Sequence, residues 1–251
     1  MSSGVLIFQG MTVGVLQGDF QISVDDAGGV NSKLILSTSY NVIPIWLHIA
    51  NNHFISARAA SEALKNQWNE DAEKQKTLLM SELAPSMQTI VTCGIALDAL
   101  YDMLRPHAKI SQNDIHKWKN NGTNRGAQIS EVIRCVYKIK GETFKEFKRC
   151  ITEIIKFRDM AVHPASELKN ACTRPDISVG VDWKFSAYKF TNASNCFEST
   201  MKLFIYLFEN KCKEDSVNTS IANIFMSLQE LGVVKLNEYP LDSVSSKDDG
   251  D

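Results

Sequence analysis

One helical segment near the middle of the chain places an arginine where an apolar residue is expected. Phe147, Ile151 and Ile154 recur at helical spacing, so they predict a buried helix face. The next position of that stripe, seven residues after Ile151, is Arg158. Because an arginine is almost never buried without a partner, we expect an anion or a pocket beside this guanidinium.

An aspartate and a histidine accompany this arginine at the end of the same helix. Asp159 follows it directly, and His163 comes five residues after Arg158. Pro164 disfavours helical geometry at the residue before it, so the helix should end at or just before His163. There the imidazole can turn back toward Arg158. Asp159 precedes His163 by four residues, which is close enough to orient the ring.

These three side chains together suit the cleavage of a phosphodiester. A guanidinium binds phosphate oxygens with a planar fork and keeps its charge. An imidazole takes or gives a proton near neutral pH. RNA carries its own nucleophile in the 2′-hydroxyl group, so this chemistry does not require a metal ion. The sequence shows no clear carboxylate cluster for a metal, and we expect no cofactor and no metal.

A structural role for the same residues stays open. A histidine at a helix C-terminus is favourable through the helix dipole alone. Arg158 could instead form an ion pair with one of three carboxylates, those of Asp98, Asp102 and Glu153. Asp98 interrupts the apolar surroundings of the helix expected over residues 85–105, so it is the candidate polar support for the site. It could equally be a solvated neighbour of Asp102, four residues along the same helix.

The composition limits which classes of protein the chain can belong to. It has 251 residues, of which 44% are hydrophobic and 22% are charged, as in ordinary globular proteins with a substantial core. The net charge of −2 gives no overall field that attracts nucleic acid. Any contact with RNA must therefore use a local basic site, for which Lys156 and Arg174 are candidates.

Targeting signals and cysteine spacing indicate the compartment. The first residues lack the positive segment of a signal peptide, and the most apolar run, residues 42–50, is too short to span a bilayer. None of the six cysteines belongs to a CxxC pair, which argues against a zinc site. We therefore expect a cytoplasmic protein without a membrane partner, with reduced thiols that fill its core.

The order of patterns along the chain predicts an α+β protein that is mainly α. Residues 1–40 read as a β appendage, because short β-rich runs alternate with turn signals. Connecting helices are expected over 41–83. An antiparallel helical bundle over 84–215 follows, and its first helix is expected to carry Pro85 in its first turn. The expected bundle helices span 85–105, 127–139, 143–160 and 192–211.

The remaining segments are expected to be less regular. Residues 164–182 read as a long loop because they contain Pro164, Pro175 and Gly180. Residues 216–242 are expected to form a C-terminal helix and a short extended segment. The polar residues 243–251 are expected to be a disordered tail. The expected architecture is thus an antiparallel helical bundle with a small N-terminal antiparallel β-sheet.

The segment Arg158-Asp159-Met160-Ala161-Val162-His163 resembles the Arg-x(4–6)-His motif of the HEPN superfamily. Many of its members also carry a polar residue directly after the arginine, as Asp159 does here. The helices expected between residues 84 and 212 are similar to the small antiparallel bundle of that superfamily. The resemblance therefore covers the bundle, and it leaves the N-terminal residues 1–40 unexplained.

The resemblance implies a metal-independent RNA endonuclease of a defence or toxin–antitoxin system. It also implies a homodimer in which two motifs face one cleft, and an antitoxin or another defence-system partner protein. Arg158 would stabilise phosphate charge, and His163 would transfer a proton or position the 2′-hydroxyl. Asp159 would support the site. Lys156 and Asp98 are the further candidates for contact with substrate.

Two other functions remain open from the sequence. Some HEPN proteins have lost catalysis, so the chain could be an inactive helical dimer that acts as an interaction or regulatory module. One subgroup carries a tyrosine two residues after the histidine as the target of a nucleotidyltransferase, and here that position is Ala165. The motif could also be coincidental in an unrelated α+β binding protein, since its spacing is common by chance.

Overall fold

The computed structural model describes residues 5–7, 10–163 and 168–235 of the chain. These residues divide into two units, one within residues 1–42 and the other from Ile43 onward. The first contains only β-strands, and the second is mainly helical with one small hairpin. The expected class, α+β and mainly α with small antiparallel sheets, is therefore confirmed.

The N-terminal unit consists of two antiparallel two-stranded ladders. Strand β1 (Met11–Gly14) pairs with β4 (Ser37–Tyr40), and β2 (Phe20–Val24) pairs with β3 (Val30–Leu34). The turn between β2 and β3 forms because the Asp25 carboxylate accepts hydrogen bonds from the backbone N–H groups of Ala27 and Gly29. The β appendage expected over residues 1–40 thus contains four short strands in the described part.

The second unit contains eight α-helices among the described residues. In chain order these are α1 (Ile43–Gln67), α2 (Ala72–Leu104), α3 (Gln112–Asn120), α4 (Arg125–Tyr137), α5 (Gly141–Val162), α6 (Trp183–Ala187), α7 (Phe190–Glu209) and α8 (Asp215–Glu230). A single 3₁₀ turn, η1 (Arg105–His107), follows α2. Strands β5 (Cys172–Arg174) and β6 (Val179–Val181) form the hairpin before α6.

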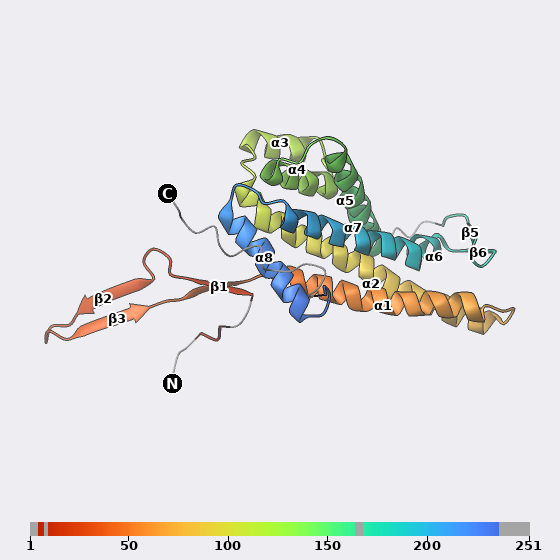
Figure 1. Cartoon of the computed structure of the whole chain (residues 1–251), viewed down its shortest axis with the longest axis horizontal. Helices are drawn as coiled ribbons and strands as arrows, with labels where there is room; N and C mark the ends of the chain where they lie inside the picture. The colour runs from red at the N-terminus through yellow and green to blue at the C-terminus, as the bar shows by residue number, and fades with distance from the viewer. Residues whose placement is uncertain (1–4, 8–9, 164–167, 236–251) are drawn as a thin grey trace, which may run out of the picture. The chain divides into compact units, whose positions relative to one another are not determined.

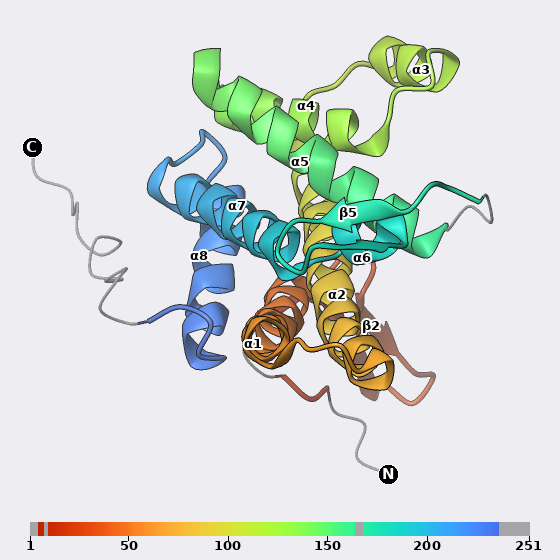
Figure 2. The ribbon, with the colours of Figure 1, turned by 90° about the vertical axis from the view of Figure 1, so that its right-hand side faces the viewer.

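Helix α2 lies at the centre of this unit. It packs along α1, and α4, α5 and α7 also contact it. Figures 1 and 2 show α1 and α2 side by side, with α5 crossing α2. Leu97 and Leu100 of α2 belong to the same buried core as Ile151, Ile154 and Ile155 of α5. The apolar stripe of the sequence therefore forms the core as expected.

One helix begins earlier than the sequence suggests. Pro85 does not stand in a first turn but inside α2, which begins at Ala72 with Asp71 as its N-cap. The Asp71 carboxylate accepts hydrogen bonds from two N–H groups of the first turn. A proline removes a helix hydrogen bond, but the packing of α2 along α1 stabilises the helix as a whole. The border expected at residues 83 and 84 thus falls inside one helix.

The segment expected to be a loop over residues 164–182 contains the β5–β6 hairpin instead. Residues 164–167 lie outside the described part of the chain. The expected C-terminal helix is α8, which starts at Asp215. The extended segment, expected to end at residue 242, and the tail, expected over 243–251, also lie beyond the described residues, which end at 235.

The hairpin is attached to the bundle by an arginine that the sequence suggested as a surface charge. Arg174 is 1% exposed, so it adds no basic charge to the surface. Its guanidinium donates to the Glu82 carboxylate at 2.6 Å, to the Phe185 carbonyl at 3.1 Å and to both oxygens of Asp176. Glu82 also accepts from the backbone N–H of Phe190 and so caps α7. This network joins the hairpin to α2 and α7.

By length and composition, the stretch Ala72–His107 is apolar enough to cross a membrane. Half of its most apolar window is nevertheless buried inside the protein. A single helix of this kind is weak evidence for a membrane span, because the core helix of a soluble protein has the same properties.

The Asp176–Arg174 pair predicts a pH dependence of stability. The neighbouring guanidinium lowers the pKa of Asp176 below its ordinary value of 3.8. A depressed folded-state pKa stabilises the fold above the unfolded-state value of about 4, and this stabilisation is lost as the pH falls through the folded-state value. We expect Asp176→Asn to lower the free energy of unfolding at pH 7, with a difference that shrinks below about pH 4.

Urea unfolding of both proteins between pH 7 and pH 3 measures this effect. Asp26→Asn is the matched control, because it removes an exposed carboxylate in a turn. A difference between wild type and Asp176→Asn that stays constant over the whole range would contradict the prediction.

The close contact between α4 and α5 predicts a steric effect. A Cβ atom on Gly126 would lie 2.7 Å from the Thr152 Cα, which is backbone and cannot rotate away. We expect Gly126→Ala to reduce the free energy of unfolding by about 1–3 kcal/mol, measured by denaturant unfolding. Gly14→Ala, where a Cβ meets nothing within 4 Å, is the control and should stay near neutral. Equal stability of both variants would show that α4 and α5 can separate without cost.

Candidate functional site

Two glycines allow α5 to approach its neighbours closely. A Cβ on Gly94 of α2 would lie 2.9 Å from the Arg158 Cβ and Cγ atoms, and Gly126 of α4 touches α5 at Thr152. The stem of Arg158 therefore lies directly against the backbone of α2. Because Gly94 has no side chain, the backbone of α2 makes the contact that an apolar side chain would otherwise make with this stripe of α5.

Asp98 holds the Arg158 guanidinium. One carboxylate oxygen, Oδ2, lies 2.8 Å from Arg158 Nη2, and the other, Oδ1, accepts from Arg125 Nε at 2.6 Å. The Arg158 side chain is 20% exposed and that of Asp98 is 24% exposed. Among the three carboxylates that the sequence offered as partners, Asp98 is therefore the one joined to Arg158 in the described ion pairs.

Arg125 completes this cluster from the start of α4. Its guanidinium lies over the Tyr101 ring, 3.8 Å from the ring centroid, and its Nη2 is 3.7 Å from Asp102 Oδ1. Sequence reasoning missed Arg125, because residues 120–126, which include it, read as a loop. Its position beside the N-cap Asn124 is a helix-start signal that could have placed it.

Asp159 lies beside the same guanidinium. Its Oδ1 is 3.1 Å from Arg158 Nε, but the geometry is not that of a hydrogen bond, and this buried Nε has no hydrogen-bond partner in the described part of the chain. The attraction is thus electrostatic.

His163 is the C-cap of α5, so the helix ends just before it, as the proline after it predicts. The helix stops at Val162, and the backbone N–H of His163 donates to the Asp159 carbonyl at 2.8 Å. Its imidazole is exposed and lines a hollow of about 550 Å³ together with Asp159 and Lys156. Arg158 does not line this hollow. The described contacts bring Arg158 to Asp159, and Asp159 to the hollow of His163, but they do not join the guanidinium to the imidazole.

Lys156 connects that hollow to a second one along α5. The second hollow, of about 610 Å³, is lined by the cations Lys145, Lys148 and Arg149 in addition to Lys156. Both hollows share Thr152, Lys156 and Met160. Glu153 also lines the second hollow and Lys145 pairs with Glu142 at 2.6 Å, so the cations leave a smaller positive charge along α5, of which only Lys156 shares a hollow with His163.

Another anchor fixes the backbone just before Arg158. The buried Tyr188 donates its hydroxyl to the Phe157 carbonyl at 3.0 Å, and the two rings meet edge to face. Because this carbonyl lies near the end of α5, the bond fixes the last turns of the helix. The bond therefore helps to determine where Asp159 and His163 lie at the end of α5.

The cysteines offer no activated thiol at this site. All six are free, Cys93 and Cys196 are buried, and the other four are half-buried. Burial raises the pKa of the Cys93 thiol to about 12, and burial also raises the pKa of Cys196. Such thiols stay protonated and unreactive at neutral pH. Among the described residues, no group of three or more His, Cys, Asp or Glu side chains is placed to hold a metal ion.

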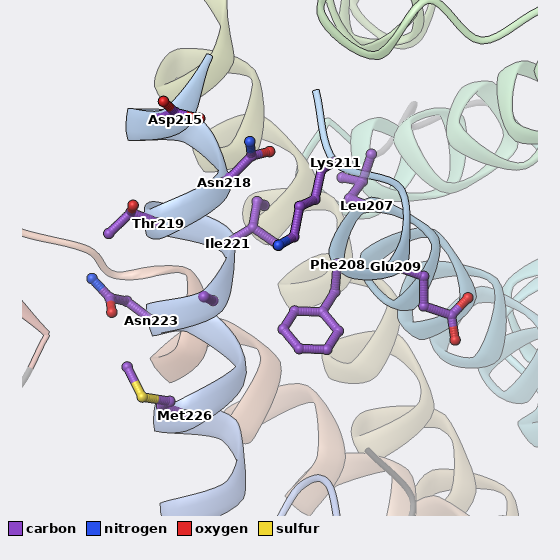
Figure 3. A pocket seen from close by; sticks show the side chains of 11 residues that line it. Leu207, Phe208, Glu209, Lys211, Asp215, Asn218, Thr219, Ile221, Asn223 and Met226 are labelled. Atoms are coloured by element: carbon purple, nitrogen blue, oxygen red, sulfur yellow. The ribbon is translucent and has the colours of Figure 1, made fainter. Parts of the chain in front are cut away.

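A further hollow of the helical unit lies elsewhere, between the end of α7 and α8. It measures about 700 Å³, and Figure 3 shows Phe208 and Lys211 facing the side chains of α8 across it. None of the motif residues lines this hollow. Its size alone does not connect it with the Arg158–His163 segment, and no pattern in the sequence predicted it.

The double role of Asp98 predicts a loss of stability on substitution. Asp98→Asn keeps the shape but removes the charge that faces two guanidinium groups, so we expect a loss of about 1–3 kcal/mol in denaturant unfolding. Asp102→Asn is the control, because that side chain is 73% exposed and lies farther from Arg125. It should change stability by less than about 0.5 kcal/mol. Equal effects of the two substitutions would contradict the role of Asp98 as the carboxylate that joins Arg125 to Arg158.

Known proteins give no direct guide to this site. The chain matches no protein-family model, and neither the curated proteins nor the solved structures provide a match.

Proposed function

We propose that this protein is a metal-independent RNA endonuclease of the HEPN type. It would work as a cytoplasmic homodimer in a defence or toxin–antitoxin system, with an antitoxin or another defence protein as its partner. The observation that carries the proposal is the exposed His163 imidazole in a hollow that it shares with Lys156 and Asp159, with Asp159 linking that hollow to Arg158. The six free thiols suit a reducing compartment.

The proposed reaction is an internal transfer at phosphorus. His163 takes the proton of the 2′-hydroxyl group, whose oxygen attacks the neighbouring phosphorus while the bond from phosphorus to the 5′-oxygen breaks. The products are a 2′,3′-cyclic phosphate and a 5′-hydroxyl, which receives its proton from water or from the imidazole of the second copy. Lys156 stabilises the charge that grows on the phosphoryl oxygens.

Arg158 would act on the hollow indirectly, through Asp159. Its charge is shared with Asp98 and Asp159, which lie within 3.1 Å of its nitrogens. In this arrangement Arg158 holds Asp159 at the rim of the hollow, and its exposed edge adds positive potential there. Asp98 is a positioning residue in this proposal, because both of its oxygens face guanidinium groups.

A second candidate function is an interaction module without catalysis. The observation that favours it is the Asp98–Arg158 ion pair, which partly neutralises the charge that a phosphate would need. In this case the cations along α5 bind an acidic partner, and His163 serves only as a favourable residue at the helix end.

Incubation of the purified protein with total RNA in the presence of a chelator tests the main proposal. His163→Ala is the sharpest variant, because an exposed side chain after the last helical residue can be removed without unfolding the protein. We expect the wild type to leave 2′,3′-cyclic ends and His163→Ala to cleave at least about 100-fold more slowly. His116→Ala, an exposed histidine on α3, is the matched control and should keep full activity.

Three results are informative here. Identical cleavage by the wild type and His163→Ala would mean that a contaminant acts, and the endonuclease proposal would fail. RNA binding without cleavage would favour the interaction module. Arg158→Lys keeps the charge but loses the planar guanidinium whose Nη2 contacts Asp98, so a fall in activity with unchanged folding would place Arg158 within the machinery.

A further inference from the structure

The β2–β3 ladder has one apolar face and one polar face. Its register pairs Phe20 with Leu34, Ile22 with Ser32 and Val24 with Val30. Residues directly opposite in an antiparallel pair point to the same side, and alternate residues share a face. Five large apolar side chains and Ser32 therefore form one face, which we call the apolar ribbon face. The other face carries Gln21, Ser23, Asn31 and Lys33.

The apolar ribbon face is open to solvent. Phe20, Ile22, Val24, Val30 and Leu34 are each between 55% and 70% exposed. Scattered apolar residues are normal on a surface, but here all five lie on one side of ten residues of strand. A two-stranded hairpin with an exposed apolar face is marginally stable in water at best, and a further layer is required to cover it.

We propose that the apolar ribbon face binds the same face of a second copy of this chain. The two ribbons would pack face to face around a two-fold axis and form a four-stranded sandwich, with the polar faces outward. A two-fold contact needs only one self-complementary patch, and this face supplies it. None of its six residues carries a charge, so two copies meet without repulsion and without a desolvated ion.

The available area is what a small, stable contact requires. A large apolar side chain that is a little over half exposed presents roughly 100 Å², so five present roughly 500 Å² on each copy. If these side chains are fully covered, two copies together bury about 1,000 Å², which is the smallest area expected of a biological interface. The backbone and Ser32 add to this area.

The shape of the ribbon favours this partner over others. Two strands alone do not form the concave pocket that a small molecule needs. A charged partner would find no complementary group among the six residues of the face. Pairing of two ribbons along their edges would satisfy backbone groups but would leave both apolar faces in water. Face-to-face contact covers the apolar surface of both copies at once.

Sedimentation of the full chain over a range of protein concentrations tests the inference. The test variant carries Ile22→Lys with Val24→Lys on the apolar ribbon face. The control carries Gln21→Lys with Ser23→Lys on the opposite face, so charge and strand are matched. We expect a wild-type dimer, a dissociation constant at least about 100-fold weaker for the test variant, and a change of less than about 3-fold for the control.

Every other result overturns the inference. A monomeric wild type at all concentrations, or equal dissociation constants for both variants, would exclude this contact. A monomeric wild type whose thermal unfolding changes only with the apolar-face substitutions would mean that the ribbon folds onto its own chain. Binding of the wild type to lipid vesicles without self-association would assign the face to a membrane surface. Because the readout is mass, the result does not depend on RNA cleavage.

Discussion

The shared carboxylate of Asp98 is the interaction on which the candidate site depends. One side chain on α2 accepts a guanidinium from α4 and another from α5, so three helices meet at a single charge. Such charge-assisted contacts are short and directional, and they remain strong where water is partly excluded. The cost of desolvating Arg158 is offset by this partner and by Asp159. Arg158 is tolerated in an apolar stripe because one carboxylate, that of Asp98, reaches it from α2 and another, that of Asp159, from its own helix.

Helix α2 organises the rest of the helical unit in the same way. Asp98 receives α4 and α5, and farther toward its N-terminus Glu82 receives Arg174 and the first N–H of α7. Between these two acidic groups lies Gly94, where α5 comes closest. Helix α2 thus holds its neighbours through charged contacts at two positions along its length, and apolar side chains pack around these contacts. The end of α5 is held on one side by Asp98 and on the other by Tyr188.

This anchoring separates the two functional candidates in chemical terms. The guanidinium of Arg158 is largely used inside the protein, while His163, Lys156 and Thr152 face the hollows along α5. A nuclease would have to do its proton transfer with His163 and rely on Lys156 for charge. An interaction module would use the same lysines and leave the imidazole idle. The N-terminal ribbon adds an independent apolar surface, whose chemistry differs from that of the cationic face.

The amino-acid sequence by itself determined the local features. The apolar stripe gave the buried face of α5, Pro164 gave its end at Val162, and the turn residues gave the short strands of the N-terminal unit. Tertiary structure alone decided the partner of Arg158, the burial of Arg174 and the passage of α2 through Pro85. Glu82 and Arg174 are 92 positions apart, and no periodic pattern reports on such a pair. Local patterns depend on neighbours within a few residues, whereas ion pairs depend on how whole helices pack.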